Sequence, residues 1–401
     1  MMSHRKNFLS LPLILLAGLG TSPSQAADEC LRHEFQHSPA WISTIALSND
    51  GQRLLIADPK SKALWALDTG SKVRSPSIAA VEAPAGAGEH FSPLTVTASD
   101  VGFLVETSEG QTFALNQTAS GSRPFHLTES STGVPSGLGS FHSGWISHGE
   151  YVLGYGAVLG KGQDLASSSP LSVRRNYEVG FVLGKLDPAG WVKQVRLLRP
   201  FEGDLNVFYR LGLSYFAGND AGLFFVQIAA RETSLWEVVL RAGEAPALKP
   251  IDAVPDGYGA PGEFRPLPEG DAEAQLDSVA RIYGQLESKK MVAGLFGQGQ
   301  MLYLLTREPA GAEGTRWSLF EIDPRNPGSP QRHLILPTTA NHLNLVPGST
   351  SWYVVEKGPV RAWGDQGIGS YLEIPTRWIV DPSEESLNAE SAEQVVCRAP
   401  R

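Results

Sequence analysis

Short apolar runs of strand length, separated by turn residues, recur along the whole chain. In the stretch 41–70, apolar and polar residues alternate over 42–48, and further apolar runs follow at 54–57 and 64–67. Asn49-Asp50-Gly51, between the first two runs, predicts a tight turn, because glycine tolerates positive φ and Asn and Asp bond to their own backbone. The stretch therefore predicts three short strands joined by two turns.

The same plan repeats with variation through the rest of the sequence. Its apolar runs begin near residues 53, 103, 151, 223, 301 and 352. A period of about 50 residues is typical of propeller blades, which stack around an axis because one blade cannot bury both of its faces. We expect an all-β protein whose residues 27–401 form a single β-propeller, with six blades, or seven as the alternative.

Two longer intervals contain predicted insertions. The first, 160–176, is polar and reads as a hairpin tip. The second, 254–290, begins with an irregular stretch rich in Pro and Gly. Its second half, 271–290, predicts a helix, because its apolar residues recur at helical spacing: they are Leu276, Val279, Ala280 and Tyr283. This helix is expected to lie across one face of the disc, as packing decoration or as a lid over the central opening.

The first 26 residues have the pattern of a signal peptide. A basic His4-Arg5-Lys6 precedes an apolar stretch over 8–19, and Ser24-Gln25-Ala26 fits a cleavage site. No later apolar stretch is long enough to span a membrane. The net charge of −9 is unlike that of a nucleic-acid-binding protein. The sequence predicts export to the periplasm or secretion.

The chain has two cysteines, Cys30 and Cys397, near its two ends. In an oxidising compartment they can form a disulfide bond. In a propeller the last blade commonly takes a strand from each terminus, so this bond would lock the closure of the ring. Two unrelated thiols are the alternative.

Basic residues precede several of the strands expected to be innermost. If the repeats are aligned at these strand starts, one end of the central channel collects a ring of them, namely His37, His90, His142, Arg210, Lys290 and His342. Such a ring could hold an anion through charge-assisted hydrogen bonds, or its imidazoles could bind a transition metal. The alternative is that polar residues are ordinary at strand starts.

One string, His33-Glu34-Phe35-Gln36-His37, matches the HExxH pattern of zinc proteases. That chemistry needs a helix that projects both histidines from one face. Pro39 limits any helix here and no third ligand is evident, so surface or strand-entry histidines are the preferred interpretation. No metal ligand set is assigned, and the cofactor, if any, is unknown.

The first repeat resembles the blades of exported bacterial propellers of the YVTN/NHL/SMP-30-like kind. The resemblance rests on Ser48 to Gly51, Leu54 to Asp58 and Leu64 to Asp68, and covers about 30 residues. It implies a superfamily that includes ligand-binding scaffolds, lactonases, lyases and quinoproteins, and therefore does not fix a function.

These observations leave three functional classes open. The leading hypothesis is an exported propeller that binds a small molecule, glycan or protein partner at one face of the disc. The second is a hydrolase or lyase that acts on an anionic or carbohydrate substrate at the central channel. The third is a protein-interaction scaffold, and the sequence alone does not say whether the protein is an enzyme.

Overall fold

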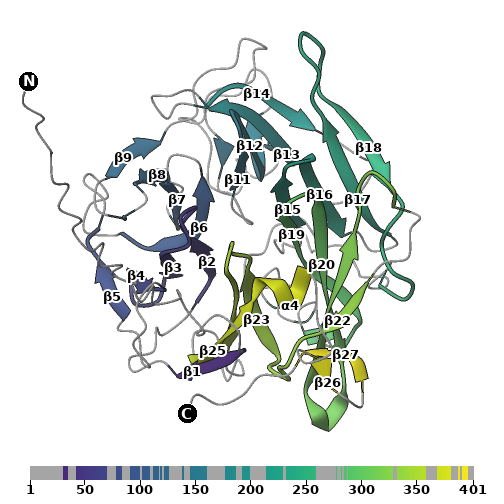
Figure 1. Cartoon of the computed structure of the whole chain (residues 1–401). Helices are drawn as coiled ribbons and strands as arrows, with labels where there is room; N and C mark the ends of the chain where they lie inside the picture. Colours follow the sequence, from purple (N-terminus) through teal and green to yellow (C-terminus); the bar gives the residue numbers. More distant parts are fainter. Residues whose placement is uncertain are drawn as a thin grey trace, which may run out of the picture.

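The computed structural model places the repeats in a ring of antiparallel sheets around a central opening (Figure 1). The residues that the structure describes are 30–34, 42–69, 78–83, 91–99, 102–108, 112–116, 118–119, 122–125, 138–139, 145–159, 177–186, 192–198, 214–228, 232–258, 277, 281, 284–286, 288–327, 332–357, 368–380, 387–388 and 391–395.

Two regular four-stranded sheets come first along the chain, each built as a meander from the channel outwards. One contains β2 (Thr44–Leu47), β3 (Arg53–Asp58), β4 (Ala63–Asp68) and β5 (Ile78–Val81). The next contains β6 (Pro93–Ser99), β7 (Gly102–Thr107), β8 (Thr112–Leu115) and β9 (Ser122–Phe125).

The third and fourth sheets continue the ring. The third contains β10 (Leu138–Gly139), β11 (Trp145–His148), β12 (Tyr151–Leu159), β13 (Tyr177–Leu186) and β14 (Val192–Leu198). The fourth contains β15 (Ser214–Asn219), β16 (Gly222–Ile228), β17 (Thr233–Val239) and β18 (Ala247–Ile251).

The last two sheets include the strands near the termini. One contains β19 (Met291–Gln298), β20 (Met301–Pro309), β21 (Thr315–Ile322), β22 (His333–Ile335), β27 (Ser391–Val395) and β26 (Leu387–Asn388), with a 3₁₀ turn, η4 (Gly311–Glu313). The other contains β23 (His342–Val346), β24 (Ser351–Lys357), β25 (Ile368–Pro375) and β1 (Leu31–Glu34), and a short helix, α4 (Thr376–Val380), follows β25.

Neighbouring sheets contact each other around the whole ring. Their innermost strands pack as β23 on β2, β2 on β6, β6 on β11, β11 on β15, and β15 on β19. The remaining junction, between the sheets of β19 and β23, is filled by an apolar cluster that includes Trp317 and Trp352. The protein is thus an all-β propeller. The described strands form six sheets that already close the ring, so the alternative of seven blades is wrong.

The apolar core lies between the sheets, because both faces of each sheet are covered by neighbours. Leu54, Ile56 and Tyr353 pack at one such junction, and Phe181, Phe216 and Phe225 at another. The middle strands β3 and β7 are buried along almost their entire length. This arrangement explains why their sequences read as continuous apolar runs instead of alternating ones.

The termini agree with the prediction in part. The N-terminal strand β1 pairs with β25 and so completes a sheet whose other strands come from the C-terminal part of the chain. The strand β27, closer to the C-terminus, pairs with β22 in the neighbouring sheet instead. Cys30 is buried, whereas Cys397 lies outside the described residues. The pairing of these two cysteines stays a prediction.

Part of the second insertion is described. Asp277, Arg281 and 284–286 are helical, as predicted. The buried Leu286 joins the cluster between the fourth and fifth sheets, and Arg307 donates a hydrogen bond to its carbonyl oxygen. The described end of the helix therefore packs against the ring. The four apolar residues predicted for its buried face, the insertion at 160–176 and the segment 1–26 lie outside the described residues. No helix in the described part of the chain has the length and hydrophobicity needed to cross a membrane.

Candidate functional site: the central channel

The innermost strands surround a cavity of about 720 Å³ on the axis of the ring. All six sheets contribute to its wall, through β2, β6, β11, β15, β19 and β23. Among the described strands, each of these pairs with another strand on one side only, so its second edge faces the channel. Backbone N–H and C=O groups are therefore part of the lining, together with side chains of the inner strands.

Side chains of the inner strands bond neighbouring sheets to each other at this wall. Thr44 Oγ1 of β2 accepts a hydrogen bond of 2.7 Å from the Val96 amide of β6. Ser43 donates to the Leu94 carbonyl, and its own carbonyl accepts from Asn344 Nδ2 of β23 at 3.4 Å. These bonds satisfy strand edges that have no strand partner and fix the positions of three inner strands.

On the opposite side of the ring, glycines allow neighbouring inner strands to approach each other closely. A Cβ atom added to Gly297 of β19 would lie 2.3 Å from the Gly218 carbonyl oxygen of β15. A Cβ at Gly294 would lie 2.9 Å from the ring of Phe296. Gly297 is therefore needed for the packing of two inner strands, whereas a side chain at Gly294 would require the Phe296 ring to shift.

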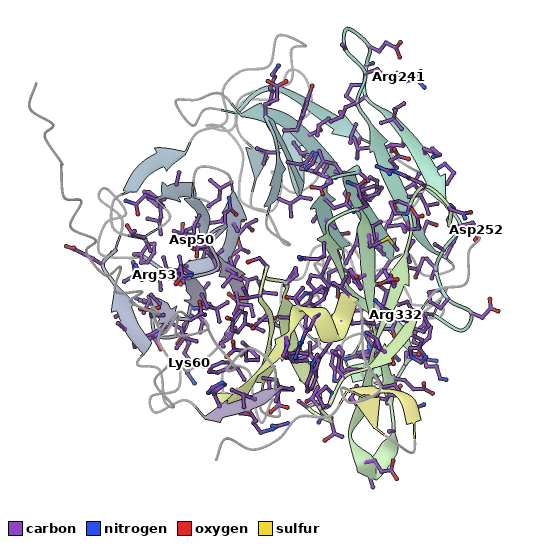
Figure 2. All side chains as sticks on the ribbon, viewed as in Figure 1. Asp50, Arg53, Lys60, Arg241, Asp252 and Arg332 are labelled. Carbon is purple, nitrogen blue, oxygen red and sulfur yellow. The ribbon has the colours of Figure 1, made fainter. Side chains whose placement is uncertain are left out.

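One end of the cavity reaches the turns that follow the inner strands. Its lining there includes Asn49, Gln298 and Ser349, of which Asn49 and Ser349 are exposed. The described residues of the lining carry hydroxyl, amide, aliphatic and aromatic side chains, and none is an Asp, Glu, Lys, Arg or His. Figure 2 shows labelled charged residues such as Arg241 and Asp252 at the outer edge of the ring.

Two of the six residues of the predicted basic ring, Lys290 and His342, lie in the described part of the chain. Lys290 precedes β19, is about half exposed, and pairs with Glu308, whose hydrogen bond raises the pKa of the lysine. His342 is half-buried at the start of β23, opposite Lys357. Neither residue is among those that line the cavity. His37, His90, His142 and Arg210 lie outside the described residues, so the ring stays a prediction.

The conformation of β1 shows whether the HExxH string can form a zinc-protease motif. His33 and Glu34 lie on an extended strand, not on a helix, which excludes the zinc-protease arrangement. His33 is buried, stacks on Tyr371 with ring centroids 4.7 Å apart, and has Nε2 3.4 Å from the Glu373 carboxylate. His33 is thus a buried histidine within a strand, whereas the sequence interpretation preferred surface or strand-entry histidines; His37 lies outside the described residues. Among the described residues, no three His, Cys, Asp or Glu side chains gather as a metal site requires.

Sequence reasoning missed the channel wall itself, because it placed candidate residues in the loops before the inner strands. The hydroxyl and amide residues in and next to those strands were the feature of the sequence that could have indicated the channel wall. Thr44, Thr97 and Asn344 lie in three neighbouring inner strands, Ser43 directly precedes the first of them, and all four residues line the cavity.

Comparisons with known proteins assign the chain to no family. No protein-family model and no curated protein matches the chain. Among solved structures, a subtype N11 neuraminidase-like protein from a flat-faced bat isolate is 8% identical, covers 88% of this chain and 92% of its own, and has a TM-score of 0.45. Regucalcin, a calcium-binding protein from Agrobacterium tumefaciens, is 9% identical, with 86% and 93% covered and a TM-score of 0.40.

A third similar structure is the Swd1 β-propeller domain from Myceliophthora thermophila. It is 9% identical, with 82% of this chain and 83% of its own covered and a TM-score of 0.37. At such low identity and structural similarity, these likenesses transfer no ligand or activity to this chain.

Proposed function

We propose that this protein is an exported propeller that binds an uncharged organic ligand in its central channel. The observation that carries the proposal is the cavity of about 720 Å³ enclosed by all six inner strands. Cavities of this size, lined by apolar and aromatic groups with a few fixed polar groups, are typical of small-molecule sites. The polar groups at this wall are fixed by hydrogen bonds between strands, so little ordering is needed on binding.

The proposal moves the site from the predicted basic ring into the channel and towards its opposite end. A hydrolase or lyase is the second candidate. Its acid–base groups would come from the four ring residues that lie outside the described part of the chain. Binding has more support, since hydroxyl, amide and aromatic groups recognise neutral ligands without acid–base chemistry. Export belongs to the proposal too, and rests on the sequence of residues 1–26.

Filling the channel tests this function. The mature protein, the channel variants Ala98→Trp and Thr97→Trp, and the control Ala80→Trp are melted with a panel of neutral, anionic and cationic small molecules. Ala98 and Thr97 line the cavity, whereas Ala80 is exposed on the outermost strand β5. Circular dichroism without ligand confirms that each variant is folded.

A ligand at a hundred times its dissociation constant stabilises the native state by about 2.7 kcal/mol. The expected result is that a neutral compound raises the melting temperature of the wild type and of Ala80→Trp, but not of the folded channel variants. Equal stabilisation of all four proteins would place the site elsewhere and contradict the proposal, as would a panel from which only charged compounds stabilise.

A further inference from the structure

The channel has two chemically different walls. On the side formed by β23, β2 and β6, the lining contains hydroxyl and amide side chains: Asn344, Ser43, Thr44 and Thr97. The hydrogen bond to Val96 uses Thr44 Oγ1 as an acceptor, so its O–H can still donate to a ligand. The bond to the Ser43 carbonyl uses Asn344 Nδ2, which leaves Oδ1 of the same amide as an acceptor.

The other side of the channel, formed by β15 and β19, carries the aromatic residues of the described lining, beside smaller ones such as Ser214. Tyr215 and Phe296 line it, both half-buried. The ring of Phe296 is held on two sides. The Trp352 ring lies edge-on with centroids 6.2 Å apart, and the backbone of Gly294 leaves the ring just enough room. The phenyl group is therefore positioned before any ligand arrives.

The rim at the open end continues the neutral polar character. Asn49 belongs to the turn after β2, Gln298 ends β19, and Ser349 belongs to the turn after β23. These three side chains come from three different sheets around the opening. Each can both donate and accept hydrogen bonds. A ligand that enters here meets groups that match hydroxyls and amides.

We propose that the ligand of the channel is an uncharged saccharide. A sugar ring has an apolar C–H face and a periphery of hydroxyl groups that both donate and accept. The C–H face fits against Phe296 and Tyr215, because the negative face of an aromatic ring attracts polarised C–H groups. The hydroxyl groups then face Asn344, Thr44 and Thr97. This inference rests on the proposed channel-binding function and names its ligand class.

Isothermal titration calorimetry on the full mature protein tests the ligand class. The probes are neutral oligosaccharides (maltotriose, cellotriose and chitotriose) and one charged counterpart, trigalacturonic acid. At least one neutral oligosaccharide is expected to bind, and trigalacturonic acid is expected to bind at least tenfold more weakly. Absence of binding by all three neutral probes at millimolar concentration, or equal binding of the acidic probe, overturns the saccharide inference.

Single substitutions test whether each wall contributes to saccharide binding. Asn344→Leu is expected to weaken binding about 3- to 10-fold, the value of one neutral hydrogen bond, and Phe296→Leu by a similar factor. Phe296→Trp keeps an aromatic face and should retain binding. The control Asn116→Leu replaces an exposed asparagine beyond β8 and should leave binding unchanged. Unchanged binding in both Asn344→Leu and Phe296→Leu contradicts the inference.

The channel-filling variants separate this inference from the proposed function. If a neutral compound that is not a sugar binds the wild type but not Thr97→Trp, the channel is a binding site and the saccharide inference fails alone. If an oligosaccharide binds the wild type and a folded Thr97→Trp equally, binding lies outside the channel and both fail.

Discussion

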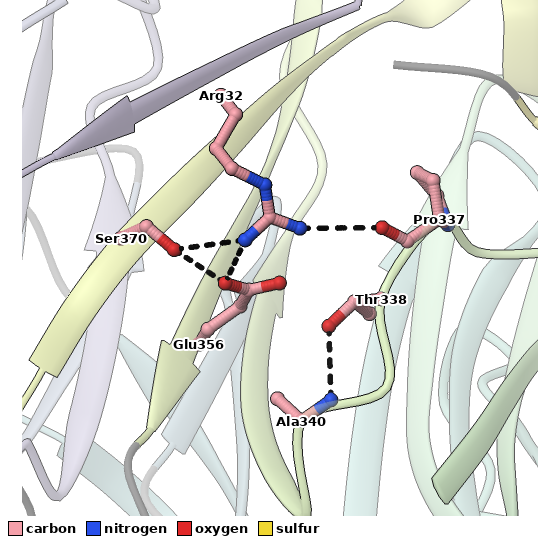
Figure 3. Close-up of polar contacts among 6 residues, drawn as sticks. All are labelled: Arg32, Pro337, Thr338, Ala340, Glu356 and Ser370. Carbon is pink, nitrogen blue, oxygen red and sulfur yellow. Dashed lines mark hydrogen bonds and ion pairs between the residues drawn. The ribbon is translucent and has the colours of Figure 1, made fainter. Parts of the chain in front are cut away.

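The N-terminal strand β1 is held in the ring by a side-chain clamp centred on Arg32, and its removal gives a measurable prediction. Arg32 Nη1 lies 2.5 Å from Glu356 Oε2 of β24 and donates to Ser370 Oγ of β25 at 3.1 Å (Figure 3). Arg32 Nη2 donates to the Pro337 carbonyl at 3.4 Å, in the segment that leads from β22 to β23. Arg32 therefore connects β1 both to its own sheet and to the neighbouring one.

The magnitude follows from how far the clamp is shielded from water. The Glu356 side chain is 13% exposed, and the Arg32 side chain is 41% exposed. Breaking a fully buried ion pair costs about 3–5 kcal/mol, whereas an exposed pair contributes less than about 1 kcal/mol. Because one partner is shielded and the other is not, Arg32→Met should lower the free energy of unfolding by about 1–3 kcal/mol.

Urea unfolding followed by tryptophan fluorescence measures this change. The control Lys249→Met breaks the ion pair of Lys249 with Glu237 on the outer strand β18, where the lysine side chain is 61% exposed. It should cost less than about 1 kcal/mol. A double-mutant cycle with Glu356→Gln isolates the coupling between the two partners. If Arg32→Met costs no more than Lys249→Met, the clamp does not hold the ring closed and the reasoning is wrong.

Three further predictions follow from packing, cysteine pairing and tyrosine burial. Gly297→Ala should destabilise the protein by about 1–3 kcal/mol, because its Cβ would overlap a backbone carbonyl of β15, whereas Gly284→Ala, with no atom within 4 Å, should be neutral or slightly stabilising in urea unfolding. Thiol titration of the unfolded, unreduced protein should find no free thiol if Cys30 and Cys397 pair, and two free thiols would refute the pairing. Burial raises the pKa of three tyrosines, Tyr303, Tyr353 and Tyr371. Folding therefore favours their neutral form, and their contribution to stability, complete below about pH 10, should fall as the pH rises further; unfolding curves at pH 8 to 11 that show no such loss would contradict it.

The sequence predicted the fold because middle strands carry a strong pattern. The apolar run at 54–57 became β3, and the run that begins near residue 301 became β20. Both strands are covered on two faces, so their residues must be apolar throughout. The helical spacing in 271–290 was also informative, since Asp277 and Arg281, one turn apart, are both exposed.

The sequence could not predict which strands the terminal strands β1 and β27 would pair with. Residues 31–34, LRHE, contain one apolar residue, and β1 is held by Arg32 and by its backbone pairing with β25. The short strand β27 joins β22 in parallel through a single register pair, Ile335 with Gln394. Neither strand has a periodicity that specifies a partner, because their pairing depends on ring geometry and not on a local pattern.

The channel was harder to predict for a related reason. Its wall consists of strand edges and small polar residues, which look like ordinary surface residues in a sequence. The ring of basic residues was attractive because charged side chains suggest chemistry. The described lining instead uses residues such as Thr44 and Asn344, whose significance appears only when six strands meet on one axis.

Ring closure and ligand recognition share the same atoms in this protein. The inner edges of the six sheets have no strand partner in the part of the chain that the structure describes, and the side chains of Ser43, Thr44 and Asn344 bond adjacent sheets across them. These side chains also line the cavity. A channel residue that bonds to a neighbouring sheet should therefore affect stability and binding together, whereas Thr97, for which the structure shows no such bond, should affect binding with little loss of stability. Measuring both quantities in each variant separates the two roles.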